Sequence, residues 1–503
     1  MTDSVPDDAG GIGSRTAIGA TWLIAWRMVT RALGLVSTLV LARLLVPDDF
    51  GLVAMAAAFS AAIDSLSELG LVAALVRQPD ARRDLYDTAF TMQALRGLLT
   101  GAVIAGGAWS VSAWFAEPRL LPILLLLAGL SALSGLENIG IVEFQRSLRF
   151  SMEFKLLFFP RIAQFVVTIA AALLLHSYWA LVIGIVVARV SRLAMTYVVH
   201  PYRPRASLAG WRDLVGFSFW TWMASLASLV WDRCDTFILG RGFGAGDLGL
   251  YLLAAEIAVM PISELVAPAS RALFAGFAAA QNRGTDTVNV ALPVVATMLL
   301  VVVPLTIGVS AASGYVVAAL LGPKWAAAQP LIATLVWLCV FSPFSYLCMT
   351  VLTSRGLVKQ HFYVIAVAAA VKAAVVYAVS FTQSLDAVAL AAVVCVALES
   401  LLFTLQLRRY GARWTGSLGG FSRIAAAAGV TVALVYQTGL GWQPASMAAG
   451  PALVWGAVTG GIAVLAYAAL QSGLWWMAGK PDGPETRLLD LAKGFGLRRP
   501  AAR

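Results

Sequence analysis

Two arginines stand in the middle of the first long apolar run of this chain. The run extends from Thr16 to Leu45 and contains Arg27 and Arg31, four positions apart. In a helix this spacing places both side chains on one face. A guanidinium at the centre of a bilayer costs roughly 2.5 to 3.5 kcal/mol on insertion scales, so we expect this face to line a hydrated, cationic cavity. The pattern favours a transporter of anionic, phosphate-bearing molecules.

The composition supports a membrane location for the whole chain. Of its 503 residues, 60% are apolar and 12% are charged, and the mean hydropathy is +0.82. The 4 cysteines lie in apolar runs without metal-like spacing, which argues against a disulfide framework and a metal site. The formal net charge of +10 does not indicate nucleic-acid binding, because the basic residues lie in short gaps between apolar runs.

Spans of about 20 residues cross a bilayer, and we predict an all-α polytopic membrane protein of about fourteen such helices. Two six-helix lobes related by a pseudo-two-fold axis are followed by two C-terminal helices. The predicted segments are a cytoplasmic N-terminus (1–16), an N-lobe (17–199), a cytoplasmic linker (200–213), a C-lobe (214–407), two further helices (408–476) and a basic cytoplasmic tail (477–503).

The distribution of Lys and Arg sets the expected orientation. Basic residues concentrate in alternate gaps and in the C-terminal tail, whereas the other gaps contain only Arg43, Arg119, Arg241 and Lys324. Because cytoplasmic loops carry the excess of Lys and Arg, both termini are predicted to be cytoplasmic. The basic tail is expected to lie against an anionic membrane surface.

An internal repeat supports the two-lobed arrangement. A shift of 198 positions aligns Leu41, Arg43, Asp49, Gly51 and Leu52 with Leu239, Arg241, Asp247, Gly249 and Leu250. A repeat of six spans gives two copies in the same membrane sense, which is the parallel-repeat design of secondary transporters. Positions 27 and 31 align with Ser225 and Leu229, so the two lobes are expected to differ in function.

The segments from Arg31 to Ala56 and from Ser67 to Asp80 resemble the polysaccharide transporter family. This family contains the Wzx-type flippases of the multidrug, oligosaccharidyl-lipid and polysaccharide exporter superfamily. The resemblance implies alternating-access transfer of undecaprenyl-pyrophosphate-linked oligosaccharides to the periplasmic leaflet of the bacterial inner membrane, for exopolysaccharide, O-antigen or capsule synthesis. The run Arg31-Ala-Leu-Gly34-Leu35 is also similar to a segment of lipid II flippases, which implies that Arg31 meets the diphosphate.

Further cations inside the spans are candidate substrate ligands, because guanidinium and ammonium groups suit phosphate oxygens. Arg27 and Arg31 could instead pair with Asp64 and Glu68. Arg161, like Arg192 of the sixth span, could reach the cytoplasmic headgroups, and Arg233 could pair locally. Lys372 could pair with Glu399 or Glu256. The candidate cationic ligands are Arg27, Arg31, Arg96, Arg161, Arg233 and Lys372.

Several acids also lie in the spans, and each could couple transport to a proton or sodium ion or serve as a counter-ion. No metal or organic cofactor is expected. The acids are Asp64, Glu68, Glu137, Glu256, Glu264 and Glu399.

Two other functions share some of these features. A drug or cation antiporter of the same fold would favour an acidic cavity, whereas the first span has arginines and no acid. A membrane polysaccharide polymerase or glycosyltransferase would be expected to carry a long extramembrane loop or clustered catalytic carboxylates, and neither is found. The expected partners are the lipid-linked oligosaccharide and membrane lipids, with contact to polymerase and glycosyltransferase machinery left open.

Overall fold

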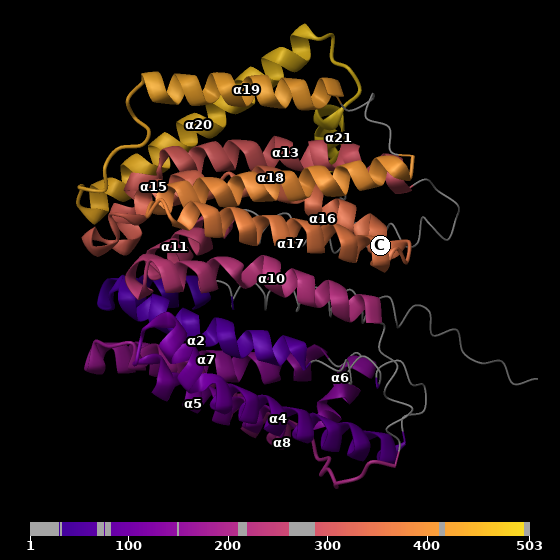
Figure 1. Cartoon of the computed structure of the whole chain (residues 1–503). Coiled ribbons are helices and arrows are strands. Elements are labelled where there is room, and N and C mark those ends of the chain that lie inside the picture. The colour runs from indigo at the N-terminus through magenta and orange to yellow at the C-terminus, as the bar shows by residue number, and fades with distance from the viewer. Residues whose placement is uncertain are drawn as a thin grey trace, which may run out of the picture. The chain divides into compact units, whose positions relative to one another are not determined.

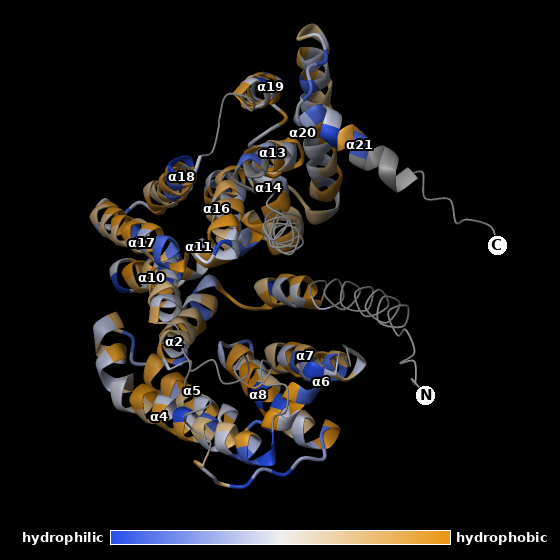
Figure 2. Ribbon diagram, turned by 90° about the vertical axis from the view of Figure 1, so that its right-hand side faces the viewer, coloured by the Kyte–Doolittle hydropathy of each residue, from blue (hydrophilic) through white to orange (hydrophobic). Residues whose placement is uncertain are grey.

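The computed structural model of the chain is all-helical in the part that it describes. The described residues are 30, 33–67, 75, 82–147, 150–209, 219–260, 287–411 and 418–496. Within them, nine helices are long and apolar enough to span a membrane, or ten when a bent pair is counted as one span. The all-α polytopic prediction is therefore confirmed, while the count of fourteen stays a prediction. Figure 2 shows hydrophobic residues distributed along the helices of the described residues.

The chain divides into two compact units, and each is described by itself. The first comprises residues 1–218 with 244–246, and the second comprises 219–243 with 247–503. The elements of the first unit, in indigo and purple in Figure 1, follow an apolar helix at Leu33–Leu44. They are α2 (Pro47–Leu66), α4 (Arg83–Phe115), α5 (Leu120–Ser134), the short η1 (Ile139–Ile141), α6 (Val142–Arg146), α7 (Phe150–Leu175) and α8 (Trp179–Val199).

The second unit begins with α10, which packs along α17, and continues to the C-terminal helix α21. Its buried apolar cluster joins side chains of α13, α16, α18, α19 and α20. The elements are α10 (Phe219–Gly242), α11 (Ala245–Ala258), α13 (Thr287–Ala311), α14 (Ser313–Val316), η3 (Val317–Leu321), η4 (Pro323–Trp325), α15 (Ala328–Leu335), α16 (Leu338–Ser354), α17 (Val358–Ser380), α18 (Leu385–Arg409), α19 (Leu418–Gln437), α20 (Ala449–Met477) and α21 (Pro484–Gly496).

The sequence repeat coincides with the first residues of two helices, one in each copy of the repeat. Helix α2 begins at Pro47 and α11 begins at Ala245, so the two starts keep the offset of the sequence repeat. In α2, Asp49 caps the helix, because its carboxylate accepts hydrogen bonds from the backbone N–H of Val46 at 3.2 Å and of Tyr178 at 2.9 Å. A carboxylate near a helix N-terminus satisfies free N–H groups and favours the helix dipole. Asp49, one of the polar residues that match in the repeat, therefore has a structural role as the cap of α2.

Glycines bring α4 and α5 unusually close together. A Cβ added at Gly97 of α4 would lie 2.7 Å from the Cα of Gly135, and one added at Gly135 would lie 2.8 Å from the carbonyl oxygen of Gln93. Side-chain carbon atoms do not tolerate such distances, so glycine is required at both positions. The close approach draws the polar residues beside these glycines together.

The segment after α8 is tied to the start of α4. Tyr202 donates a hydrogen bond from its hydroxyl to Asp87, and the backbone N–H of Arg205 donates to the same carboxylate at 2.8 Å. Asn138 donates from its side-chain amide to the carbonyl of Tyr202 at 2.7 Å. Burial, followed by the nearby Asp87 carboxylate, raises the pKa of the Tyr202 phenol. These bonds fix the ends of α4 and α8, and with them the side chains that these helices present to the first unit.

Candidate functional site

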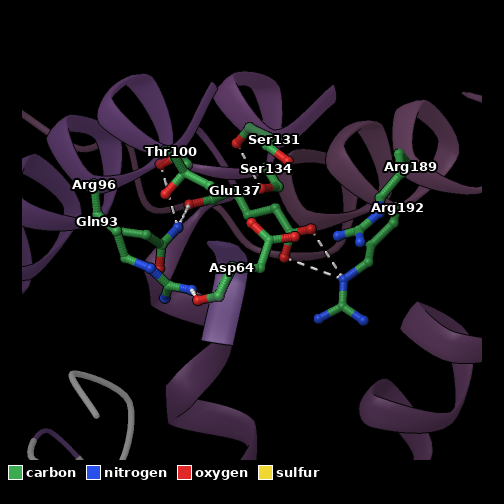
Figure 3. Close-up of a pocket in the computed structure, with 11 residues that line it drawn as sticks. Asp64, Gln93, Arg96, Thr100, Ser131, Ser134, Glu137, Arg189 and Arg192 are labelled. Atoms are coloured by element: carbon green, nitrogen blue, oxygen red, sulfur yellow. Dashed lines mark hydrogen bonds and ion pairs between the residues drawn. The ribbon is translucent and has the colours of Figure 1, made fainter. Parts of the chain in front are cut away.

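A polar cavity of about 290 Å³ lies among α2, α4, α5 and α8 of the first unit. Figure 3 shows that its side chains converge from these helices and from the turn after α5. The lining residues are Asp64, Gln93, Arg96, Gly97, Thr100, Ser131, Ser134, Gly135, Glu137, Arg189 and Arg192.

Arg96 is held in place by the end of α2. Its Nε donates to the hydroxyl of Ser67 at 3.1 Å, and one terminal nitrogen donates to the backbone carbonyl of Asp64 at 3.1 Å. The Ser67 hydroxyl also accepts from Thr100 at 3.0 Å and donates to the same Asp64 carbonyl at 2.8 Å. Because backbone and hydroxyl groups orient Arg96, its placement does not depend on a carboxylate.

Glu137 connects α4 and α8 at the other side of the cavity. Its backbone carbonyl accepts a hydrogen bond from Gln93 at 3.1 Å. Its carboxylate accepts two bonds from Nε of Arg192, at 3.0 and 3.1 Å. The two terminal nitrogens of Arg192 point away from Glu137 in Figure 3, so this carboxylate does not use the donors on that edge of the guanidinium.

Asp64 and Arg189 complete the charged lining. The Asp64 carboxylate interacts electrostatically with Arg189 and Arg96 and with the hydroxyl of Ser131. Arg189 is exposed, one helical turn before Arg192. The cavity therefore combines three guanidinium groups with two carboxylates and several neutral donors and acceptors. Guanidinium groups match phosphate oxygens, whereas amide and hydroxyl groups can bind the hydroxyls of sugars.

The second unit contains a different charged group, at the contact between α10 and α17. Nζ of Lys372 lies 2.8 Å from Oδ2 of Asp235, and it also donates to the carbonyl of Trp231 at 2.8 Å. It lies 4.8 Å from the centre of the Trp231 ring, and Tyr251 donates to Asp235 at 3.3 Å. The ion-pair partner of Lys372 is thus Asp235, and not Glu399 or Glu256 as the sequence suggested.

The other candidates within the described residues are dispersed. Arg161 is exposed, donates to Gln164 at 3.1 Å and lies beside Gly34 of the first apolar helix. Arg233 is exposed on α10 and interacts with its neighbour Asp232. Glu256 is exposed on α11.

Glu399 is buried on α18, where its carboxylate accepts a hydrogen bond from Ser345 of α16 at 3.0 Å. Arg27, Arg31, Glu68 and Glu264 lie outside the described residues.

The structure thus brings together one predicted cation, Arg96, and two predicted acids, Asp64 and Glu137. The sequence interpretation assigned Arg192 to the headgroups and did not name Gln93, Thr100, Ser131 or Ser134. A signal for Arg189 and Arg192 existed in their spacing of three, which places both on one helix face. The neutral residues had no comparable signal, because isolated Ser, Thr and Gln are common in membrane helices.

Comparisons with known proteins agree with this architecture. Residues 40–330 match the family model described as polysaccharide biosynthesis protein. The teichuronic acid biosynthesis protein TuaB of Bacillus subtilis is 22% identical over 59% of this chain and 62% of its own length. The lipopolysaccharide biosynthesis protein WzxC of Escherichia coli is 25% identical over 65% of this chain and 66% of its own length. The matches therefore span a little under two thirds of these relatives.

Solved structures define the fold further. The lipid II flippase MurJ, in an inward closed conformation, aligns with a TM-score of 0.73 at 12% identity and covers 91% of this chain and 99% of that chain. An inward-facing multidrug transporter of the MATE family, within the MOP superfamily, aligns with a TM-score of 0.58 at 13% identity, over 76% of this chain and 94% of that chain. The chain is a multi-pass membrane protein with this fold, and it belongs to the polysaccharide biosynthesis protein family.

Proposed function

We propose that this protein is a flippase that moves undecaprenyl-pyrophosphate-linked oligosaccharides from the cytoplasmic to the periplasmic leaflet by alternating access. The observation that carries the proposal is the cavity of the first unit, in which Arg96, Arg189 and Arg192 face one space. A diphosphate is a compact polyanion that loses hydration on entering the membrane, and forked guanidinium donors replace that hydration. The neutral hydroxyl and amide groups of the lining would take the adjoining sugar.

In the predicted orientation this cavity lies toward the cytoplasm, where the substrate would bind before transport. It lies beside the end of α2 and in the later half of α8, which the charge distribution assigns to the cytoplasmic side. A substrate assembled in the cytoplasm would reach these arginines first. In the proposal Arg27 and Arg31 extend the cationic surface along the first helix, with Arg31 at the diphosphate.

A drug or cation antiporter is less consistent with this cavity, since its three cations outnumber its two acids. We therefore favour a transporter of anionic lipid-linked sugars over an antiporter of cations. In the proposal the polyprenyl chain stays in lipid, and the protein supplies a path for the polar head alone.

The test is translocation by the purified protein in liposomes, with a fluorescent polyprenyl-diphosphate-linked sugar as probe. Replacing Arg96 with Ala removes a charged hydrogen-bond donor worth about 1.5 to 3 kcal/mol, which corresponds to a loss of roughly 10- to 100-fold in translocation. Arg409→Ala, at an exposed arginine in the last turn of α18, is the matched control and should keep the wild-type rate. Wild-type translocation by Arg96→Ala would refute the assigned site, and hydrolysis of the probe would favour an enzyme.

A further inference from the structure

The cavity of the first unit contains carboxylates of its own beside the three arginines. Asp64 lines the same cavity as Arg96 and Arg189 and lies near enough to interact electrostatically with both, and Glu137 binds Arg192. A site that only captured an anion would be expected to exclude acidic side chains, because like charges repel the ligand. The two acids therefore need an explanation that the binding of a diphosphate alone does not supply.

The pair between Glu137 and Arg192 is suited to exchange. The Arg192 side chain is 45% exposed and the Glu137 side chain 14% exposed. Only Nε of Arg192 contacts the carboxylate, and the two terminal nitrogens are directed away from it. Exposed ion pairs of this kind contribute little net stability. An incoming phosphate can therefore take over the guanidinium without a large loss.

Asp64 is arranged so that its carboxylate can leave without disturbing Arg96. The bonds that orient Arg96 go to the backbone carbonyl of residue 64 and to the Ser67 hydroxyl. The Asp64 side chain supplies charge to Arg96 and Arg189 and contacts Ser131. Arg96 would thus remain in place when a ligand displaces the carboxylate.

We propose that Asp64 and Glu137 are exchangeable counter-ions, which neutralise the arginines of the empty cavity and yield them to the diphosphate when substrate binds. This inference rests on the proposed flippase function. When the loaded protein changes conformation, the negative charge of the diphosphate neutralises the arginines. When the empty protein returns, the carboxylates of Asp64 and Glu137 neutralise the arginines instead.

The physical reason is the cost of uncompensated charge in a membrane. A guanidinium without a partner is unfavourable in a low-dielectric environment. When one partner of a charge pair is removed, nothing offsets the desolvation free energy of the charge that remains. Three arginines without counter-ions would make closure of the empty cavity slow. Exchange of carboxylate for phosphate lets both directions of the cycle proceed with compensated charge, and it involves no covalent step.

The experiment uses the full-length protein in liposomes with a farnesyl-diphosphate-linked N-acetylglucosamine that carries a fluorophore. Two modes are compared. In net translocation, the probe starts in one leaflet and the empty protein must return. In exchange, both leaflets contain probe and the protein can move loaded in both directions.

The test variant is the double substitution Asp64→Asn with Glu137→Gln, which keeps the shape and the backbone bonds. We expect its net translocation to fall at least about tenfold, corresponding to a barrier higher by about 1.4 kcal/mol, while exchange stays within about twofold of wild type and affinity for the probe is equal or higher. Glu143→Gln is the control, because Glu143 is 59% exposed, pairs with His200 and lies outside the cavity. It should leave both modes unchanged.

The outcomes separate this inference from the proposed function. Equal rates for the double variant and wild type in net translocation would overturn the counter-ion role. Equal losses in both modes would overturn it as well, because the carboxylates would then be needed for binding or folding. A wild-type protein that moves the probe in neither mode would refute the flippase function itself.

Discussion

Two ion pairs, one in each unit, show opposite uses of charge inside a membrane protein. The pair of Arg192 with Glu137 lines a cavity, and its arginine side chain is 45% exposed. The pair of Lys372 with Asp235 lies between two long helices, with side chains only 8% and 12% exposed. Lys372 has further partners in the carbonyl and the ring of Trp231, whereas Arg192 has terminal nitrogens directed away from its partner.

We infer from this difference that burial and the number of partners, more than the presence of a charge, distinguish a structural contact from a candidate binding site. A buried pair with its remaining donors satisfied is costly to break, because one charge would be left in a low-dielectric environment. A half-exposed pair is easily replaced by a ligand. We therefore interpret the Lys372 pair as a permanent connection between α10 and α17, and the Arg192 pair as part of a working site.

Loss of the buried pair in the second unit should destabilise the protein most. Asp235→Ala would leave Lys372 buried without its carboxylate, and we expect a loss of about 3 to 5 kcal/mol in the free energy of unfolding. Thermal unfolding of the protein in detergent, followed by the exposure of buried cysteines, measures it. Asp235→Leu combined with Lys372→Met should recover most of the stability. If Asp235→Ala were as stable as wild type, the Lys372 pair would be no more important for stability than the pair of Arg192 with Glu137.

An intermediate effect is expected at Glu117, in the turn between α4 and α5. Its carboxylate binds Arg119 at 2.7 Å, and the two side chains are 19% and 42% exposed. The hydrogen bond from Arg119 lowers the pKa of Glu117 below its ordinary value of 4.5. The pair therefore stabilises the folded protein fully above this value, and its contribution of up to about 1 kcal/mol disappears as the pH falls through the lower folded-state pKa.

The measurement is the unfolding midpoint in detergent between about pH 6 and about pH 3.5. Glu117→Gln should be less stable than wild type at the higher pH and should approach it at the lower pH. A constant difference across this range would contradict the assignment of the stabilisation to the ionised carboxylate.

The smallest expected effect on stability is at the cavity. Glu137→Gln should change the free energy of unfolding by only ~0.3 kcal/mol, because the pair with Arg192 is half-exposed. The same thermal assay applies, with Asp235→Ala measured alongside as the large reference. A loss comparable to that of Asp235→Ala would place Glu137 among the structural residues and would remove the contrast between the two units.

Much of the architecture could be predicted from the sequence, because membrane spans depend on local composition. Long apolar runs specify helices, since a segment in lipid must satisfy its own backbone hydrogen bonds. The repeat was visible because polar residues such as Asp49 and Asp247 sit at one offset, and the structure shows helix starts at the same offset. Arg96 and the acids Asp64 and Glu137 were recognisable as costly charges within spans.

The partners of these charges could not be predicted, because they come from helices distant in sequence. Asp235 and Lys372 are 137 positions apart and meet through the packing of α10 on α17. Glu137 and Arg192 are 55 positions apart, and they meet where the end of α5 packs near α8. The spacing of residues along one helix contains no information about which neighbour lies opposite.

The apolar runs alone identify a multi-spanning helical protein with charged residues inside its spans, because the free energy of inserting each helix depends on that helix alone. Which of these charges are neutralised, and which can meet a ligand, is fixed when the helices pack together. That outcome depends on distances between helices, on burial and on shared hydrogen bonds, and these quantities exist only after packing.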